Sequence, residues 1–273
     1  MERADKQLIF CNAACELSKA KLHFHTIQFL KRSGKPGYSY LPYGSGVLVR
    51  IVDHYFIFTA SHVTKGAEID KLYVNTRVGV HQVIGTCQEM DFERDKHMDL
   101  AYIQLDKMLG MLLAESYQFL ELPKLSHSHK PKQNSNYMVS GYPAKNIWKE
   151  GEDIYTGSSH FLMSMADEKW LRHYNFDPGR NYGLSFAGRG IDINTDKKTE
   201  KIGDPHGISG CGLWYLQVRP EPGNINLDYV LIGIMTEYRN GKYHMLIGNR
   251  LEPIMADMED RGLFPFDWLT LSK

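Results

Sequence analysis

The sequence predicts an all-β protein whose antiparallel strands close into barrels. Short stretches rich in β-branched and aromatic residues follow one another from residue 46 to residue 105, with turn-forming residues between them. The same pattern resumes near residue 137 and again after residue 230. Many short strands joined by turns favour a closed β architecture. A chain of 273 residues is long enough to bury a large core.

The N-terminal segment is expected to form a helix that leads into the first strands. Apolar residues recur there at helical spacing, namely Leu8, Ile9, Ala13, Leu17 and Ala20. A second, alternating set could instead begin a strand, namely Leu22, Phe24, Thr26 and Gln28. The turn-rich segment 31–43 is interpreted as a linker or hairpin.

Strand patterns then follow in quick succession. Gly46–Val52 and Tyr55–Thr59 flank Asp53-His54, which predicts a hairpin. Further strands are expected at Leu72–Val74, Val80–Gly85 and Leu100–Leu105. The leucine-rich segment 108–120 is interpreted as a connection to the second half, which resumes at Tyr137–Tyr142. Residues 145–203 are more irregular, and after a strand at Tyr243–Ile247 a terminal helix is expected near Glu252–Asp260.

Composition is that of an ordinary folded protein and argues against several kinds of partner. Hydrophobic residues make up 42% of the chain, and 32 basic residues balance 32 acidic ones. Because no excess charge is present, no nucleic acid is expected as a partner. No apolar run approaches the length of a membrane span, so no membrane association is expected either.

Three short motifs carry the chemistry. A serine in a glycine frame, Gly207-Ile208-Ser209-Gly210-Cys211-Gly212, precedes an apolar run. Thr59-Ala60-Ser61-His62 follows an apolar strand, and Met98-Asp99-Leu100-Ala101 opens another. The order His, Asp, Ser along the chain is one of the known orders of a Ser-His-Asp triad.

Each motif meets a chemical need. A serine hydroxyl is a weak nucleophile at neutral pH, so it requires a base such as imidazole within hydrogen-bond reach. A carboxylate on the other ring nitrogen fixes the tautomer of that imidazole. Glycines next to the serine allow backbone N–H groups to converge on a developing oxyanion.

At these residues the chain resembles the trypsin-like serine peptidases, which have the chymotrypsin fold. The three motifs resemble the family's T-A-[AS]-H, D-[IL]-A and G-x-S-G. Leu231–Thr236 is similar to the strand beside the family's substrate pocket, and Val139–Pro143 is similar to the turn that opens its second barrel. The resemblance covers roughly residues 41–255, and members of bacterial, intracellular type are the nearest comparison.

The resemblance implies two antiparallel six-stranded β-barrels after an N-terminal extension at residues 1–40. The first barrel, residues 41–125, would carry His62 and Asp99. The second, residues 126–273, would carry Ser209 and the C-terminal helix. His62 would be the general base, Asp99 its orienting group and Ser209 the nucleophile, with Gly207 and Ser209 supplying the oxyanion hole.

Two of these assignments have competitors. Cys211 stands between glycines, and some viral proteases of this fold use a cysteine nucleophile, but Gly207 and Gly210 frame Ser209 better. Asp95 is the alternative to Asp99, which is favoured because an apolar strand follows it at once. The other nearby carboxylates, Asp91 and Asp106, are interpreted as turn formers.

The chain also departs from the family pattern. Ile208 stands where zymogen-activated members carry an aspartate, so that activation route is not expected. Gly203 and Asp204 occupy the region that would form the base of the substrate pocket. Thr236, Glu237 and Tyr238 would line the substrate groove, with Tyr238 narrowing the pocket and Glu237 favouring positive charge in the substrate.

No cofactor and no metal are expected. Two histidine pairs and one cysteine pair lack the further ligands of a zinc site and are interpreted as structural or solvated, namely His23 with His25, His127 with His129, and Cys11 with Cys15. Four cysteines are few for a secreted relative of this size, and the charged N-terminus leads into no signal-like apolar stretch. The cytoplasm of a bacterium, or another reducing compartment, is therefore the expected location.

The leading hypothesis is a serine endopeptidase that cleaves a protein or peptide substrate. A dedicated substrate and a regulatory protein partner would fit such an enzyme. The alternative is a catalytically weak or inactive protease fold used as a binding or sensor module. A third hypothesis is hydrolysis of esters by the same residues.

Overall fold

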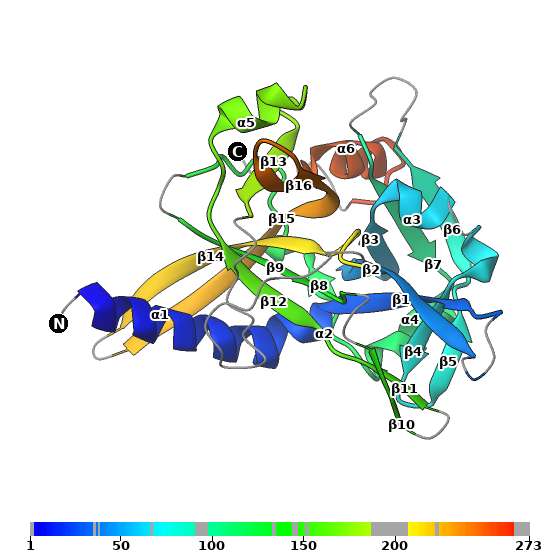
Figure 1. Ribbon diagram of the computed structural model, residues 1–273. Helices are drawn as coiled ribbons and strands as arrows, with labels where there is room; N and C mark the ends of the chain where they lie inside the picture. The colour runs from blue at the N-terminus through cyan, green and yellow to red at the C-terminus, as the bar shows by residue number, and fades with distance from the viewer. Residues whose placement is uncertain are drawn as a thin grey trace.

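The computed structural model describes residues 3–264 except for 35–36, 38, 66–67, 91–97, 133–134, 144–146, 151–152, 187–206 and 222–223. Two antiparallel sheets make up most of it, and short helices lie around them (Figure 1). This arrangement confirms the prediction of an all-β protein. Among the helices that the structure describes, none combines the length and apolar character needed to cross a lipid bilayer.

The chain begins with an unbroken helical run. Helix α1 (Arg3–Leu17) continues through a π-helical turn (Ser18–Leu22) into the single turn α2 (His23–His25), and strand β1 (Thr26–Arg32) follows directly. The predicted helix is therefore present, but β1 pairs with β2 and β4 and belongs to the first sheet. Strand β1 thus lies within the predicted extension 1–40, and its residues Ile27 and Phe29 are buried in the apolar cluster of the first barrel.

The first sheet has the strand order β5-β4-β1-β2-β3-β7-β6, and β8 pairs with β2 beside this path. Its remaining strands are β2 (Tyr40–Ile51), β3 (His54–Thr59), β4 (Tyr73–Thr76), β5 (Gly79–Gln82), β6 (Gly85–Glu89), β7 (Ala101–Leu105) and β8 (Leu120–Glu121). The short helices of this half are α3 (Ser61–Lys65), a 3-10 turn (Ile69–Lys71), α4 (Lys107–Ala114) and a second 3-10 turn (Leu122–Lys124).

This sheet closes because its two end strands are consecutive in the chain. Only Val83 and Ile84 separate β5 from β6. The Val83 N–H donates to the Leu72 carbonyl, and the Ile84 carbonyl accepts from the Asp106 N–H. The ladder thus continues from β4 to β7 without a break. With β5 and β6 taken as one bent strand and two-residue β8 set aside, the predicted six-stranded barrel is obtained.

The second sheet has six strands in the order β12-β9-β14-β15-β16-β13. They are β9 (Asn136–Gly141), β12 (Ser159–Met163), β13 (Asn181–Ser185), β14 (Gly212–Glu221), β15 (Asn224–Asn240) and β16 (His244–Arg250). The segment after β12 joins the two end strands, since Met165 bridges Leu184 and the Ala166 N–H donates to the Gly183 carbonyl. A separate hairpin, β10 (Ile147–Glu150) with β11 (Asp153–Thr156), and the helices α5 (Glu168–His173) and α6 (Glu252–Asp260) complete this half.

The described residues form four buried apolar clusters, and the three largest follow from the alternation of side chains along these strands. Leu48 points into the first barrel, whereas its neighbours Val47 and Val49 point outward to the second barrel. In the same way Leu213 lies inside the second barrel and Trp214 lies between the two. The cluster between the barrels also takes in residues of α1 and α6. This packing fixes the barrels face to face, with the loops at their junction forming the candidate site.

Candidate active site

His62 lies where the first barrel meets the second. Strand β3 ends at Thr59, and the short helix α3 begins at Ser61, so that His62 leaves the barrel at the start of this helix. Thr59, Ala60 and Ser61 are buried, whereas half of the His62 side chain is exposed, at 50%. A rigid, buried strand end therefore presents an accessible imidazole.

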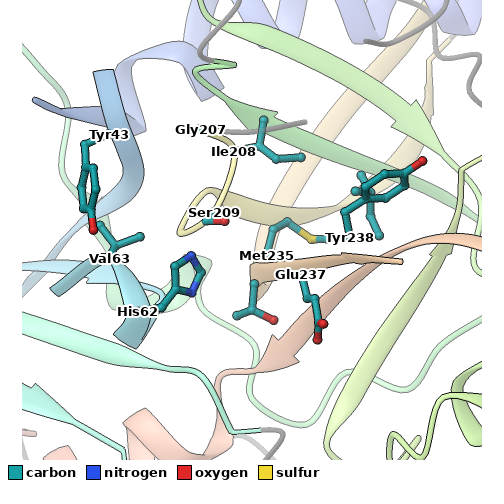
Figure 2. Close-up of a pocket in the computed structure, with 11 residues that line it drawn as sticks. Tyr43, His62, Val63, Gly207, Ile208, Ser209, Met235, Glu237 and Tyr238 are labelled. Carbon is teal, nitrogen blue, oxygen red and sulfur yellow. The ribbon is translucent and has the colours of Figure 1, made fainter. Parts of the chain in front are cut away.

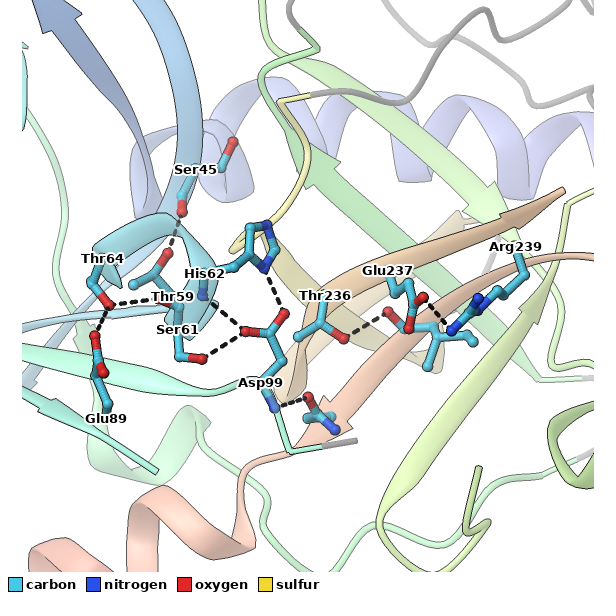
Figure 3. A network of polar contacts seen from close by, with 12 residues as sticks. Ser45, Thr59, Ser61, His62, Thr64, Glu89, Asp99, Thr236, Glu237 and Arg239 are labelled. Atoms are coloured by element: carbon cyan, nitrogen blue, oxygen red, sulfur yellow. Dashed lines mark hydrogen bonds and ion pairs between the residues drawn. The ribbon is translucent and has the colours of Figure 1, made fainter. Parts of the chain in front are cut away.

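Asp99 is the residue that holds this imidazole. It lies two residues before β7 and receives three hydrogen bonds, shown in Figure 3. The Ser61 hydroxyl (2.7 Å) and the His62 backbone N–H (2.9 Å) donate to Oδ1. The His62 Nδ1 lies 2.5 Å from Oδ2. Nδ1 therefore carries a proton toward Asp99, and Nε2 is left to face the pocket.

Among the described residues, no other candidate carboxylate is bonded to His62. Asp106 caps α4, where its Oδ1 accepts hydrogen bonds from the Met108 and Leu109 N–H groups. Asp91 and Asp95 lie outside the described residues. Of the carboxylates that the structure describes, Asp99 is the one bonded to His62.

The two charges favour each other's ionised forms. The Asp99 hydrogen bond raises the pKa of His62 above its ordinary value, burial opposes this rise, and the charges of Asp99 and Glu237 add to it. Burial by itself would raise the pKa of Asp99, but the hydrogen bonds and charge of His62, with the bond from Ser61, lower it overall. An aspartate held ionised beside a histidine stabilises the imidazolium that forms when His62 accepts a proton.

The second barrel contributes a further contact to this pair. The Asp99 backbone N–H donates to Oδ1 of Asn249 at 3.1 Å. Asn249 is buried on β16, 150 residues away in sequence. Sequence analysis missed it, because no local pattern links an asparagine on one barrel with a loop on the other.

The Ser209 segment is a tight turn at the start of β14. Gly207 (φ 93°) and Gly210 (φ 86°) both adopt backbone conformations that other residues rarely take. A Cβ at Gly210 would lie 2.0 Å from the Ser45 carbonyl oxygen and 2.2 Å from Thr59 Oγ1, so only glycine fits. Gly210 of the glycine frame is thus required by the close approach between the two barrels.

Backbone hydrogen bonds hold this turn from both sides. The Ser45 N–H on β2 donates to the Ser209 carbonyl (2.8 Å), and the Gly210 N–H donates to the Met235 carbonyl on β15 (2.7 Å). Among the described residues, no acceptor binds the N–H groups of Gly207 or Ser209. These two donors are therefore available for a ligand.

His62 and Ser209 line one pocket of about 520 Å³ (Figure 2). Its other lining residues are Tyr43, Val63, Gly207, Ile208, Met235, Thr236, Glu237, Tyr238 and Leu246. All three residues predicted to line the substrate groove are among them. Within the part of the chain that the structure describes, the Ser209 hydroxyl makes no hydrogen bond to His62. Such bonds are often long or poorly aligned without substrate.

Cys211 is turned away from this pocket. Its side chain is fully buried in the core of the second barrel, at 0% exposure, and burial raises the pKa of its thiol. Ser209, in contrast, is partly exposed in the pocket. The geometry therefore favours the serine over the cysteine as a nucleophile.

The side chains of the predicted groove have their own partners. The Glu237 carboxylate lies 2.6 Å from the Arg239 guanidinium (Figure 3). The Tyr238 ring packs edge-on against Phe186, with 5.1 Å between ring centroids. Gly203 and Asp204, predicted near the base of the pocket, lie outside the described residues.

The histidine pairs have structural surroundings. His25 is buried and bonds the Gln118 carbonyl through Nδ1 and the Tyr229 hydroxyl through Nε2. His23 bonds the Ser158 hydroxyl, and His129 the Tyr137 hydroxyl. No group of three or more potential metal ligands gathers among the residues that the structure covers.

Comparison with known proteins places the fold. No sequence-family model matches this chain, and no curated protein matches it. The crystal structure of the scabies mite inactivated protease paralogue S-I1 is similar over 88% of this chain and 95% of its own, with a TM-score of 0.54 at 15% identity. The scabies mite paralogue S-D1 is similar over 88% and 92%, with a TM-score of 0.51 at 12% identity. The protein therefore has the two-barrel, chymotrypsin-like fold of the serine proteases.

Proposed function

We propose that this protein is a serine endopeptidase in which His62, Asp99 and Ser209 form the catalytic triad. One observation carries the proposal: the His62 ring is bonded through Nδ1 to Asp99 and shares a pocket with Ser209. A buried structural histidine would not combine a carboxylate on one nitrogen with an accessible pocket at the other.

The reaction follows from these positions. The Ser209 hydroxyl attacks the carbonyl carbon of the scissile peptide bond while His62 Nε2 accepts its proton. The N–H groups of Gly207 and Ser209 stabilise the resulting oxyanion. His62 then donates the proton to the leaving amine, and an acyl-enzyme remains on Ser209. A water molecule, deprotonated by His62, then attacks this ester, and His62 returns the proton to Ser209 Oγ as the acyl–oxygen bond breaks and the second product leaves.

The substrate is proposed to be a protein or peptide bound in extended form along Thr236, Glu237 and Tyr238. Their place in the lining of the pocket supports this role. Gly203 and Asp204 are proposed to contribute to substrate selection from the pocket base. A cleavage preference for positively charged neighbouring residues would follow from Glu237.

The setting of the enzyme is part of the proposal. We infer a regulated protease of bacterial, intracellular type with a dedicated protein substrate and a regulatory protein partner. None of the four cysteines, all of which the structure describes, forms a disulfide, which fits a reducing compartment. Direct measurement of the cellular location and of co-purifying proteins tests these points separately from catalysis.

A fluorophosphonate probe tests the nucleophile. The pure, folded protein is expected to be labelled at Ser209, as located by peptide mass spectrometry. Ser209→Ala is expected to abolish labelling, whereas Cys211→Ser, two residues away and buried, should keep it. An unlabelled wild-type protein would contradict the proposed catalysis. Parallel assays with peptide and ester substrates identify the bond that is cleaved.

A second candidate function is binding by an inactive protease fold. The observation that favours it is the missing hydrogen bond between Ser209 and His62 among the described residues. In that case the protein would bind peptides in the pocket without turnover, and neither Ser209→Ala nor His62→Ala would change their affinity by much. Labelling of Ser209 excludes this candidate.

A further inference from the structure

We propose that Ser45, on β2 of the first barrel, is the positioning residue that sets the orientation of the Gly207–Ser209 turn for oxyanion binding. This inference rests on the proposed function, since it concerns the same site. The Ser45 side chain is fully buried, at 0% exposure, and lies outside the pocket lining. It would therefore act through the turn and not on the substrate.

The side chain of Ser45 has an unambiguous hydrogen-bond direction. The Tyr142 N–H donates to Ser45 Oγ at 3.1 Å, and Ser45 Oγ lies 2.8 Å from the Gly207 carbonyl oxygen. A backbone N–H can only donate, and a carbonyl can only accept. The single hydroxyl proton of Ser45 must therefore point at Gly207.

The backbone of Ser45 adds two more contacts. Its N–H donates to the Ser209 carbonyl at 2.8 Å. Its carbonyl accepts from the Thr59 hydroxyl at 2.8 Å, which ties Ser45 to the end of β3, just before the helix that carries His62 (Figure 3). Ser45 thus holds the carbonyls on both sides of Ile208 and connects them to the end of β3.

The Ser45 hydroxyl is needed to restrain the Gly207 backbone because glycine restrains it little by itself. With no Cβ, its peptide groups rotate at little cost, and its φ of 93° is a conformation open mainly to glycine. Among the described residues, Ser45 Oγ is the hydrogen-bond donor to the Gly207 carbonyl. The Ser209 N–H is held separately, because the Ile208 carbonyl of the same peptide group accepts from the Cys211 N–H. Ser45 therefore fixes the Gly207–Ile208 peptide group, and through the Gly207 Cα it limits the directions open to the Gly207 N–H in the preceding peptide group.

The test compares Ser45→Ala with Ser18→Ala. Ser18 is also fully buried and hydrogen-bonded, to the Ala14 carbonyl and Met138 Sδ, but it lies outside the pocket lining. Both variants lose a buried hydroxyl, so both lose some stability. Only Ser45→Ala is expected to lower kcat, on the order of tenfold, with little change in KM, because the oxyanion exists only in the transition state. Ser45→Cys, which keeps a weaker donor, should fall between them and serves if the alanine variant does not fold.

A second measurement does not need activity. Amide hydrogen exchange of the peptide that contains residues 207–211 should become faster in Ser45→Ala than in the wild-type protein or Ser18→Ala. If kcat and exchange in both Ser45 variants match those of Ser18→Ala, the positioning role is wrong. If the wild-type protein shows neither turnover nor probe labelling, the proposed function is wrong, and the exchange experiment still decides whether Ser45 orders the turn.

Discussion

The two barrels supply their halves of the candidate site by different means. The first barrel holds His62 through side chains, with three hydrogen bonds converging on the Asp99 carboxylate. The second barrel holds Ser209 through the backbone of a glycine-framed turn. A side-chain network can be tuned by single substitutions, whereas a backbone turn depends on glycines and on what packs behind it. Substitutions around His62 should therefore remove hydrogen bonds or reacting groups, whereas substitutions around Ser209 should change the position of the turn.

Each barrel also forms hydrogen bonds that hold the other barrel's part of the candidate site. Ser45 of the first barrel bonds the Ser209 turn, and Asn249 of the second barrel bonds the backbone of Asp99. Each barrel thus positions a group that belongs to its partner's half of the site.

Removal of the reacting groups has the largest expected effect and breaks both halves at once. Ser209→Ala and His62→Ala should each lower kcat by about 10⁶, and the double variant should lose no more, because the residues act as a unit. Steady-state or single-turnover hydrolysis measures this. Cys211→Ser is the control and should retain most activity. Additive losses would show that the two residues do not cooperate.

Asp99→Asn changes only the carboxylate on which the hydrogen bonds of the first barrel converge. The amide offers Nδ1 of His62 the wrong partner and favours the wrong tautomer, so kcat should fall by about 10⁴ while the fold is kept. The pKa of His62, followed by NMR, should fall at the same time, since the hydrogen bond and charge that raise it are lost. An unchanged His62 pKa would contradict the pairing.

Asn249→Ala removes the contact of the second barrel with Asp99. The Asp99 N–H would lose its acceptor at a partly buried place, and kcat should fall on the order of tenfold through misplacement of the carboxylate. Asn181→Ala is the matched control, because Asn181 is a buried asparagine on the neighbouring strand β13. Equal activity of the two variants at equal stability would remove Asn249 from the site.

Tyr238→Gly changes the pocket but not the triad. The ring that packs on Phe186 is lost, so large side chains should be accepted a few-fold better relative to small ones. Labelling by a small fluorophosphonate should stay close to that of the wild-type protein. Profiling with a peptide library measures the preference. An unchanged preference would mean that this strand does not select substrates.

Glu237→Gln has the smallest expected effect, a shift in pH dependence. His62 acts as a base when neutral, so kcat/KM rises with pH through its pKa. Glu237 raises that pKa. The glutamine variant should therefore reach full activity at a lower pH, and its Arg239 partner, left with its positive charge, acts in the same direction. A shift of the profile to higher pH would contradict this assignment.

The sequence predicted what local motifs encode. The strand predicted at Val80–Gly85 lies in β structure, but the structure divides it between the end of β5 and the start of β6, with two linking residues between them. The sequence predicts His62, Asp99 and Ser209 as site residues because each stands in a short motif next to a strand. The structure places all three at the junction of the barrels.

The missed features depend on contacts between distant residues. Strand β1 was assigned to the extension because its alternation could be read in two ways, and only its pairing with β2 and β4 decides. Ser45 and Asn249 act across 162 and 150 residues of sequence. For Ser45 the sequence held a signal, since Gly44 and Gly46 flank it as glycines flank Ser209. Asn249 has no comparable pattern around it.

The cluster between the barrels has a consequence for how the protein unfolds. It contains 22 of the described buried side chains, against 13 inside each barrel. Apolar side chains of both barrels are therefore buried together in one cluster, and each barrel depends in part on the other for that burial. Neither barrel should persist alone, and heating should melt both in a single cooperative transition. A half-assembled site would then never be populated, so a cell that contains this protein would hold either the complete pocket or an unfolded chain.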